Sequence, residues 1–149
     1  MYQKILVPLD GSSRAERILW HVEEIALQHR SRIVFLQVVR PVIVTDGYKT
    51  IQPEESLAGS RRAIDEARAY LAVVQGEFRE KGIETKRIAE IGPVVSTILG
   101  VAQREAVDLI AMASHGRSGL SRAFYGSVAA GVLNQVDRPL LLIRARSEE

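Results

Sequence analysis

The stretch "ASHGRSGLSRAFYGS", Ala113 to Ser127, holds the side chains best suited to chemistry. It combines three glycines, four serines, two arginines and one histidine, and its first residue is the last of the apolar run "DLIAMA". Glycine lets a backbone approach a ligand closely, and serine and arginine donate hydrogen bonds to anions. Gly126 and Ser127 are placed to open a helix, whose N-terminus presents free N–H groups to a phosphate. The stretch fits a phosphate-binding loop, and it equally fits a flexible connection that ends in a serine helix cap.

Asp10 is the second candidate for chemistry. It follows the apolar run "KILVPL" and precedes Gly11 and Ser12. A carboxylate accepts hydrogen bonds from a ribose hydroxyl or from the amino group of a base. An aspartate before Gly-Ser also closes a tight turn by bonding its own backbone. The sequence leaves both roles open.

The elements that position these residues alternate along the chain. Apolar runs rich in β-branched residues predict buried strands, and apolar residues at helical spacing predict helices between them. This order predicts an α/β fold, a doubly wound, Rossmann-like five-stranded parallel sheet in the order 3-2-1-4-5. The expected strands are 4–10, 31–39, 83–91, 108–113 and 138–145, and the expected helices are 12–30, 57–81, 93–106 and 127–135.

Capping residues sharpen these boundaries. Ser12 or Ser13 is expected to cap the first helix, Gly82 to end the second, and Pro93 to occupy the first turn of the third. The stretch Arg40–Ser56, with two prolines and little periodicity, is expected to form a long loop.

Helical spacing also predicts which side chains face the core. Trp20, beside Leu19 on the first helix, is expected to be partly buried. The residues expected to face inward on the second helix are Leu57, Ile64, Ala67, Leu71, Val74 and Phe78, and on the last helix Val128, Val132 and Leu133.

The predicted topology brings the two candidates together. In such a sheet, ligands bind outside the carboxyl ends of the strands, where the strand order reverses. The first and fourth strands flank that point. We therefore expect Asp10 and the segment from Ser114 to Ser127 to face one crevice.

Composition limits the function classes. The 149 residues are 46% hydrophobic and 26% charged, as expected of one globular domain over residues 1–149. The net charge of +2 comes without a dense Lys/Arg block, so we expect neither nucleic acid nor membrane as a partner. The lack of cysteine excludes disulfides and thiolate catalysis. The apolar run after Lys4 is too short for a signal peptide or membrane span, which predicts a cytoplasmic protein.

Two segments together carry a family resemblance. "KILVPLDGS" and "DLIAMASHGRSGLSRAFYGSVAAGVLNQVDRPLLLIR" resemble the universal stress protein family, and the resemblance runs along nearly the whole chain. ATP-binding members carry the loop pattern G-x2-G-x9-G-[S/T]. Gly116, the nine residues "RSGLSRAFY" and Gly126-Ser127 match it, whereas Ala113 replaces the first glycine. Alanine is tolerated if that glycine only gives clearance beside the ribose. Binding suffers if the position needs a left-handed backbone.

The resemblance implies a fold similar to the adenine nucleotide alpha hydrolases. It also implies a bound adenine nucleotide, ATP, with a divalent ion such as Mg²⁺ carried on its phosphates. Asp10 would contact the adenosine portion, with Pro8 and Val38 lining the adenine slot. The other nucleotide-binding residues that it implies are Leu9, Met112, Ala113, Gly116, Arg117, Gly126, Ser127 and Val128. Family members commonly dimerise through the last strand. The apolar segment Leu140–Arg144 therefore predicts a homodimer, because an apolar edge strand is usually paired.

The sequence contains few of the motifs that catalysis requires. It has no Walker lysine, no Ser-His-Asp order with a nucleophile elbow and no His-x-x-x-His metal pair. His115 is placed to act as a base or to hold the loop by hydrogen bonds, and we favour the second. We predict a regulatory nucleotide-binding protein of the stress response rather than an enzyme. The alternatives are a nucleotide-independent dimer that acts on an unidentified protein partner, which Ala113 favours, and a slow ATP hydrolase.

Overall fold

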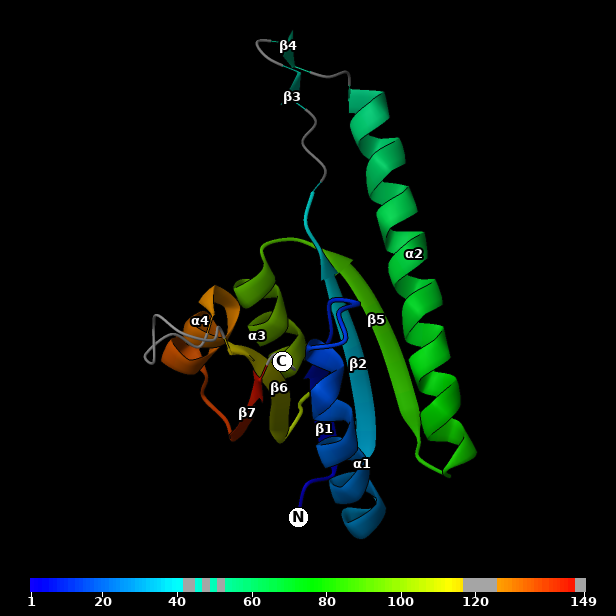
Figure 1. Ribbon diagram of the computed structural model, residues 1–149, viewed down its shortest axis with the longest axis vertical. Coiled ribbons are helices and arrows are strands. Elements are labelled where there is room, and N and C mark those ends of the chain that lie inside the picture. The colour runs from blue at the N-terminus through cyan, green and yellow to red at the C-terminus, as the bar shows by residue number, and fades with distance from the viewer. Residues whose placement is uncertain (42–44, 47–48, 51–52, 117–125, 147–149) are drawn as a thin grey trace.

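A computed structural model describes residues 1–41, 45–46, 49–50, 53–116 and 126–146 of the chain (Figure 1). Five strands form one parallel sheet in the order β5-β2-β1-β6-β7. In chain order these strands are 3-2-1-4-5, so the predicted topology is confirmed. The order reverses between β1 and β6, which pair through Ile5–Leu109 and Leu6–Ile110. The strands are β1 (Lys4–Pro8), β2 (Arg32–Val39), β5 (Thr85–Ile91), β6 (Leu109–Gly116) and β7 (Leu140–Arg146).

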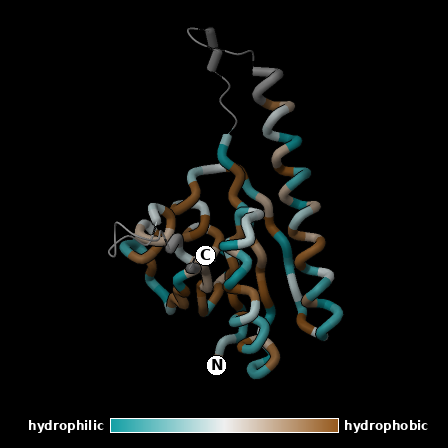
Figure 2. The backbone as a smooth tube through the Cα atoms, viewed as in Figure 1, coloured by the Kyte–Doolittle hydropathy of each residue, from teal (hydrophilic) through white to brown (hydrophobic). Residues whose placement is uncertain are grey.

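Helices cover both faces of this sheet, and two hydrophobic cores result. Successive residues of a strand pack into opposite cores. Phe35 of β2 belongs to one core and Leu36 to the other. The strands are therefore apolar in an almost unbroken run, which Figure 2 shows as brown segments at the centre of the molecule. The first core holds α1 (Ile18–His29) and α2 (Pro53–Glu80), and the second holds α3 (Val94–Arg104) and α4 (Ser127–Gln135).

The segment Arg40–Ser56 is not the continuous loop that the sequence predicts. Its described residues form a short antiparallel pair, β3 (Thr45–Asp46) with β4 (Lys49–Thr50), and α2 begins at Pro53 instead of Leu57. A proline suits the first position of a helix because its missing N–H would have no partner there. This end of α2 extends past the sheet (Figure 1), which explains why Leu57 is 60% exposed and not part of the core.

Trp20, expected to be partly buried, is 69% exposed, because Ile18 and Val22 of the same helix face the core and a residue midway between them points away. Leu133, expected to face inward, is 47% exposed, while its neighbour Val132 is fully buried. The predicted inward positions 67, 71, 74, 78 and 132 are buried.

The predicted helix signals act mostly as expected. The Ser12 hydroxyl accepts the N–H of Ala15 at 3.1 Å, and so caps a short 3-10 turn, η1 (Ala15–Arg17), that leads into α1. Gly82 follows the end of α2 with φ +81°, and its N–H bonds the carbonyl of Arg79. Pro93 lies one residue before α3 rather than inside its first turn. None of the described helices is long and apolar enough to cross a bilayer.

Candidate functional site

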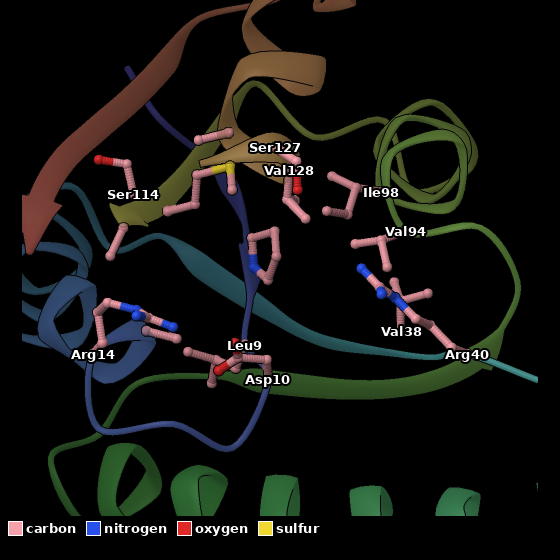
Figure 3. A pocket seen from close by; sticks show the side chains of 15 residues that line it. Leu9, Asp10, Arg14, Val38, Arg40, Val94, Ile98, Ser114, Ser127 and Val128 are labelled. Atoms are coloured by element: carbon pink, nitrogen blue, oxygen red, sulfur yellow. The ribbon is translucent and has the colours of Figure 1, made fainter. Parts of the chain in front are cut away.

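A pocket of about 350 Å³ opens at the carboxyl ends of the strands, at the point where the strand order reverses (Figure 3). Its walls come from the ends of β1, β2 and β6, from η1, and from α3 and α4. The residues that line it are Pro8, Leu9, Asp10, Arg14, Ala15, Val38, Arg40, Val94, Ile98, Met112, Ala113, Ser114, Ser127, Val128 and Ala129.

One side of the pocket is apolar. Val38 lies near the end of β2, Met112 belongs to β6, and Ile98 reaches in from α3. All three also take part in the second hydrophobic core, so packing on their far sides holds them in place. A rigid apolar wall of this kind suits a flat ring system.

Asp10 stands at the other side, in a turn that its own carboxylate closes. Its Oδ1 accepts the N–H of Ser12 at 2.9 Å and also the Ser12 hydroxyl. Gly11 between them has φ +83°, a conformation that favours glycine. The turn role of Asp10 is thus present, and because both bonds fall on Oδ1, it does not exclude the ligand role.

The N-terminus of α4 faces the same pocket. Gly126 precedes the helix with φ 72° and ψ 154°, and its carbonyl accepts the N–H of Ala130 at 3.0 Å. The first N–H groups of a helix have no partner within it, and the helix dipole makes this end positive. Ser127, Val128 and Ala129 provide these groups, and all three line the pocket.

Ala113 lies on β6, where it pairs with Ile143 of β7. It is not among the residues with positive φ. An extended backbone is open to alanine without strain, so the left-handed requirement considered for this position does not arise here. β6 continues through Gly116, three residues beyond the predicted end of the strand.

The structure therefore gathers most of the residues predicted for the site. Gly116 is the last residue of β6 and Gly126 directly precedes α4, while Arg117 lies outside the described residues. The predicted residues that line the one pocket are Pro8, Leu9, Asp10, Val38, Met112, Ala113, Ser127 and Val128.

Two arginines that the sequence analysis did not select also line the pocket. In Figure 3, Arg14 and Arg40 reach toward it from opposite sides, with Asp10 between them. Arg40 follows Val38 by two residues, and a period of two keeps side chains on one face of an extended chain. This spacing alone would have predicted that Arg40 lies on the same side of the chain as Val38. Arg14 depends on how η1 folds back over the sheet, which no local pattern indicates.

The chemistry of this set is that of binding. It offers an apolar wall, a carboxylate acceptor, two cationic side chains and a helix N-terminus. Across the described ranges, no three or more His, Cys, Asp or Glu side chains are grouped to hold a metal ion.

The chain is similar along its whole length to the universal stress protein MJ0577 of Methanocaldococcus jannaschii. The two are 27% identical, over 99% of this chain and 98% of that protein. The solved structure of MJ0577 superposes with a TM-score of 0.82 and covers 99% of both chains.

More distant structures share the fold, and several of them hold an adenine nucleotide. A universal stress protein solved in complex with cAMP is 18% identical, with a TM-score of 0.66, over 97% of this chain and 98% of that one. A family protein of Arabidopsis thaliana solved with AMP bound is 17% identical, with a TM-score of 0.67, over 97% and 93% of the two chains.

The family itself is established by a match over nearly the full length. Residues 1–144 match the universal stress protein family. This range includes all five strands of the main sheet, apart from the end of β7, and every residue that lines the pocket. The sheet order, the pocket at its switch point and this match agree, and the chain belongs to the universal stress protein family.

Proposed function

We propose that this chain binds an adenine nucleotide, ATP, in the pocket between β1, β2, β6 and α4. The observation that carries the proposal is the placement of Asp10 and of the α4 N-terminus, at Ser127, around one cavity of about 350 Å³. A carboxylate recognises hydroxyl and amino groups, whereas a helix N-terminus recognises phosphate. A nucleoside phosphate carries both kinds of group on one molecule.

Each part of the ligand has a matching wall. The base would lie against Val38 and Met112, and the ribose beside Ala113. The phosphates would meet the N–H groups at Ser127, and the other carboxylate oxygen of Asp10, Oδ2, would accept a hydroxyl or an amine. Arg14 would add positive charge to the pocket. Mg²⁺ would enter with the nucleotide, because its preferred ligands are oxygens such as those of the phosphates.

The role of the nucleotide would be regulatory. The two ends of the nucleotide would join α4 to the turn after β1, which form separate walls of the pocket. Such a ligand stabilises one arrangement of these walls, and a partner protein in the cytoplasm would bind this arrangement in preference to others. Hydrolysis would be slow, since the described lining residues include no histidine and no second carboxylate to orient a water.

The two edges of the sheet support a homodimer. β5 presents charged residues along its edge, among them Lys86, Arg87 and Glu90, and inward or edge charges discourage pairing. The opposite edge strand, β7, is apolar from Leu140 to Ile143 and pairs with β6 on its inner side. A second copy would pair along Leu140–Arg144. This dimer is also the basis of the second candidate function, a stress protein that works through protein contacts without a nucleotide.

The deciding experiment is analysis of the small molecules released from freshly purified, denatured protein, followed by calorimetric titration with ATP and Mg²⁺. ATP at a stoichiometric level, or a micromolar Kd, equivalent to about −8 kcal/mol, would support nucleotide binding. No released nucleotide and no heat at millimolar ATP would contradict it. In that case, a dimer found by sedimentation without nucleotide would favour the second candidate.

A further inference from the structure

Arg40 stands where three cavities of the structure meet. It directly follows β2 and lines the pocket that we propose for the nucleotide. It also lines a cavity of about 590 Å³ at the start of α3 and another of about 410 Å³ beside α2. No other described residue lines all three. Its exposed side chain therefore borders the nucleotide pocket where β2 ends.

The backbone that carries Arg40 is held in place by its neighbours. Val39, the last residue of β2, pairs with Ile91 of β5, and its carbonyl accepts the N–H of Gly92 at 3.0 Å. Gly92 in turn lies against Thr97, since an added Cβ at position 92 would come within 2.6 Å of the Thr97 hydroxyl oxygen. These contacts fix the point from which the side chain of residue 40 leaves the sheet.

The guanidinium group of Arg40 has no partner of its own among the described residues. Glu66, which lines the cavity beside α2, forms no ion pair with it. Figure 3 shows the Arg40 side chain directed into the nucleotide pocket, beside Val38 and Val94. Other arginines of the sheet and its connections do bond a carboxylate, an amide or a carbonyl, namely Arg32, Arg87, Arg104 and Arg138. The guanidinium of Arg40 is thus available to a ligand.

The surroundings of Arg40 suit a flat ring. A guanidinium is planar and weakly hydrated, and it stacks on the faces of aromatic rings. Its stem lies on apolar surface while the charged head stays near water, as the neighbouring Val38 and Val94 allow here. The N–H groups proposed for the phosphates belong to a different wall, at Ser127 of α4. Arg40 therefore matches the base of a nucleotide better than its phosphates.

We propose that Arg40 is a base-binding residue, whose guanidinium stacks on the purine ring and covers it at the opening of the pocket. This inference rests on the nucleotide binding proposed above. Stacking uses the face of the ring, so it depends on the plane of the side chain and not only on its charge. It contributes to the binding of a nucleoside without phosphates as much as to the binding of ATP.

Calorimetric titration of the full chain with ATP and with adenosine tests this role. Arg40→Ala should weaken both ligands by the same factor, about fivefold, because the stacked ring is common to both. Arg40→Lys keeps the charge but not the plane, and it should lose nearly as much. Arg40→Phe keeps a flat side chain and should bind within about twofold of the wild type.

A matched control and a melting experiment separate this role from general effects. Arg79→Ala removes an exposed arginine from the last turn of α2 and should bind both ligands as the wild type does. The Arg40 variants should melt with the wild type, because they break no hydrogen bond or ion pair among the described residues.

Four results would overturn the base-binding role while leaving nucleotide binding in place. They are an unchanged ATP affinity in Arg40→Ala, a loss of ATP affinity without a loss for adenosine, full affinity in Arg40→Lys, and ATP binding without adenosine binding at millimolar concentration. The second and fourth results would show that the phosphates dominate, and the third that charge is sufficient. If the wild type binds neither ligand at millimolar concentration, the nucleotide proposal fails, and the role of Arg40 fails with it.

Discussion

Asp10 and Ser12 are joined by hydrogen bonds at the mouth of the pocket that we propose for the nucleotide. The Asp10 carboxylate accepts both the N–H and the hydroxyl of Ser12 through Oδ1, and the Ser12 hydroxyl in turn accepts the N–H of Ala15. One carboxylate oxygen thus shapes the turn that leads into η1. The second oxygen is the one that the proposed ligand would use.

Because different oxygens would serve the turn and the ligand, mutation can separate the two roles of Asp10. Asp10→Asn keeps an acceptor for Ser12 but loses the charge and the second acceptor. It should melt close to the wild type and bind ATP about tenfold more weakly, the expected loss for one charged hydrogen bond. Asp10→Ala should lose both stability and affinity. Thermal melting with calorimetry distinguishes the two variants, and an unchanged ATP affinity in Asp10→Asn would remove Asp10 from the site.

Gly126 occupies a backbone region, φ 72° and ψ 154°, that is nearly restricted to glycine. Gly126→Ala should therefore cost about 1–3 kcal/mol and displace the N-terminus of α4. The matched control is Gly76→Ala in α2, where an added Cβ meets nothing within 4 Å. That variant should gain about 0.5–1 kcal/mol, because glycine weakens a helix interior. Urea unfolding measures the change in stability in each variant. Equal changes in the two variants would contradict a special backbone conformation at Gly126.

Ala113→Gly restores the residue of the family's loop pattern. Because Ala113 has a strand conformation, the change should alter ATP affinity by less than about threefold. It should lower stability by about 0.5–1 kcal/mol, the usual effect of glycine in a strand. Calorimetry and urea unfolding measure the two quantities. A tenfold gain in affinity would show instead that the alanine methyl group obstructs the pocket.

Arg138 ties the end of α3 to the strand that follows it. One guanidinium nitrogen, Nη1, donates to the carbonyls of Ala102 and Val107 at 2.9 and 3.0 Å. Arg138→Ala should destabilise the protein by about 1.5–3 kcal/mol, since it removes two hydrogen bonds from a charged donor. Asp137→Asn, which loses only the exposed ion pair with Arg138, should leave stability nearly unchanged. Urea unfolding compares them, and similar losses in both would assign the effect to the ion pair.

Glu105 predicts a pH dependence. Its carboxylate bonds Lys86 at 2.8 Å and Lys4 at 3.4 Å, and the bond to Lys86 is the main cause that lowers the pKa of Glu105 below 4.5. A carboxyl with a lower pKa in the folded state stabilises the fold above its unfolded pKa, and this contribution is lost as the pH falls through the folded pKa. Stability should therefore drop below about pH 4.5, and less steeply in Glu105→Gln. Urea unfolding of the wild type and of Glu105→Gln across this pH range tests the prediction. The same dependence of stability on pH in both proteins would contradict it.

Much of the fold follows from local pattern. Five apolar runs between amphipathic segments predict a parallel sheet, and the chirality of crossovers leaves few orders for it. The sheet order then predicts that Asp10 and Ser127 meet, although 116 intervening residues separate them in the chain. Gly82 and Ser12 mark helix ends because their roles depend only on near neighbours.

Other features depend on contacts between distant segments. The extended backbone of Ala113 is set by pairing with β7, and the exposure of Trp20 and Leu133 by how each helix is rotated against the sheet. The place of Arg14 in the pocket arises only when η1 packs on the strands. The sequence encodes how often apolar residues recur along each segment. This spacing distinguishes helices from strands, and their order along the chain favours one fold. Side-chain environments depend on the packing of whole elements, so only the tertiary structure decided them.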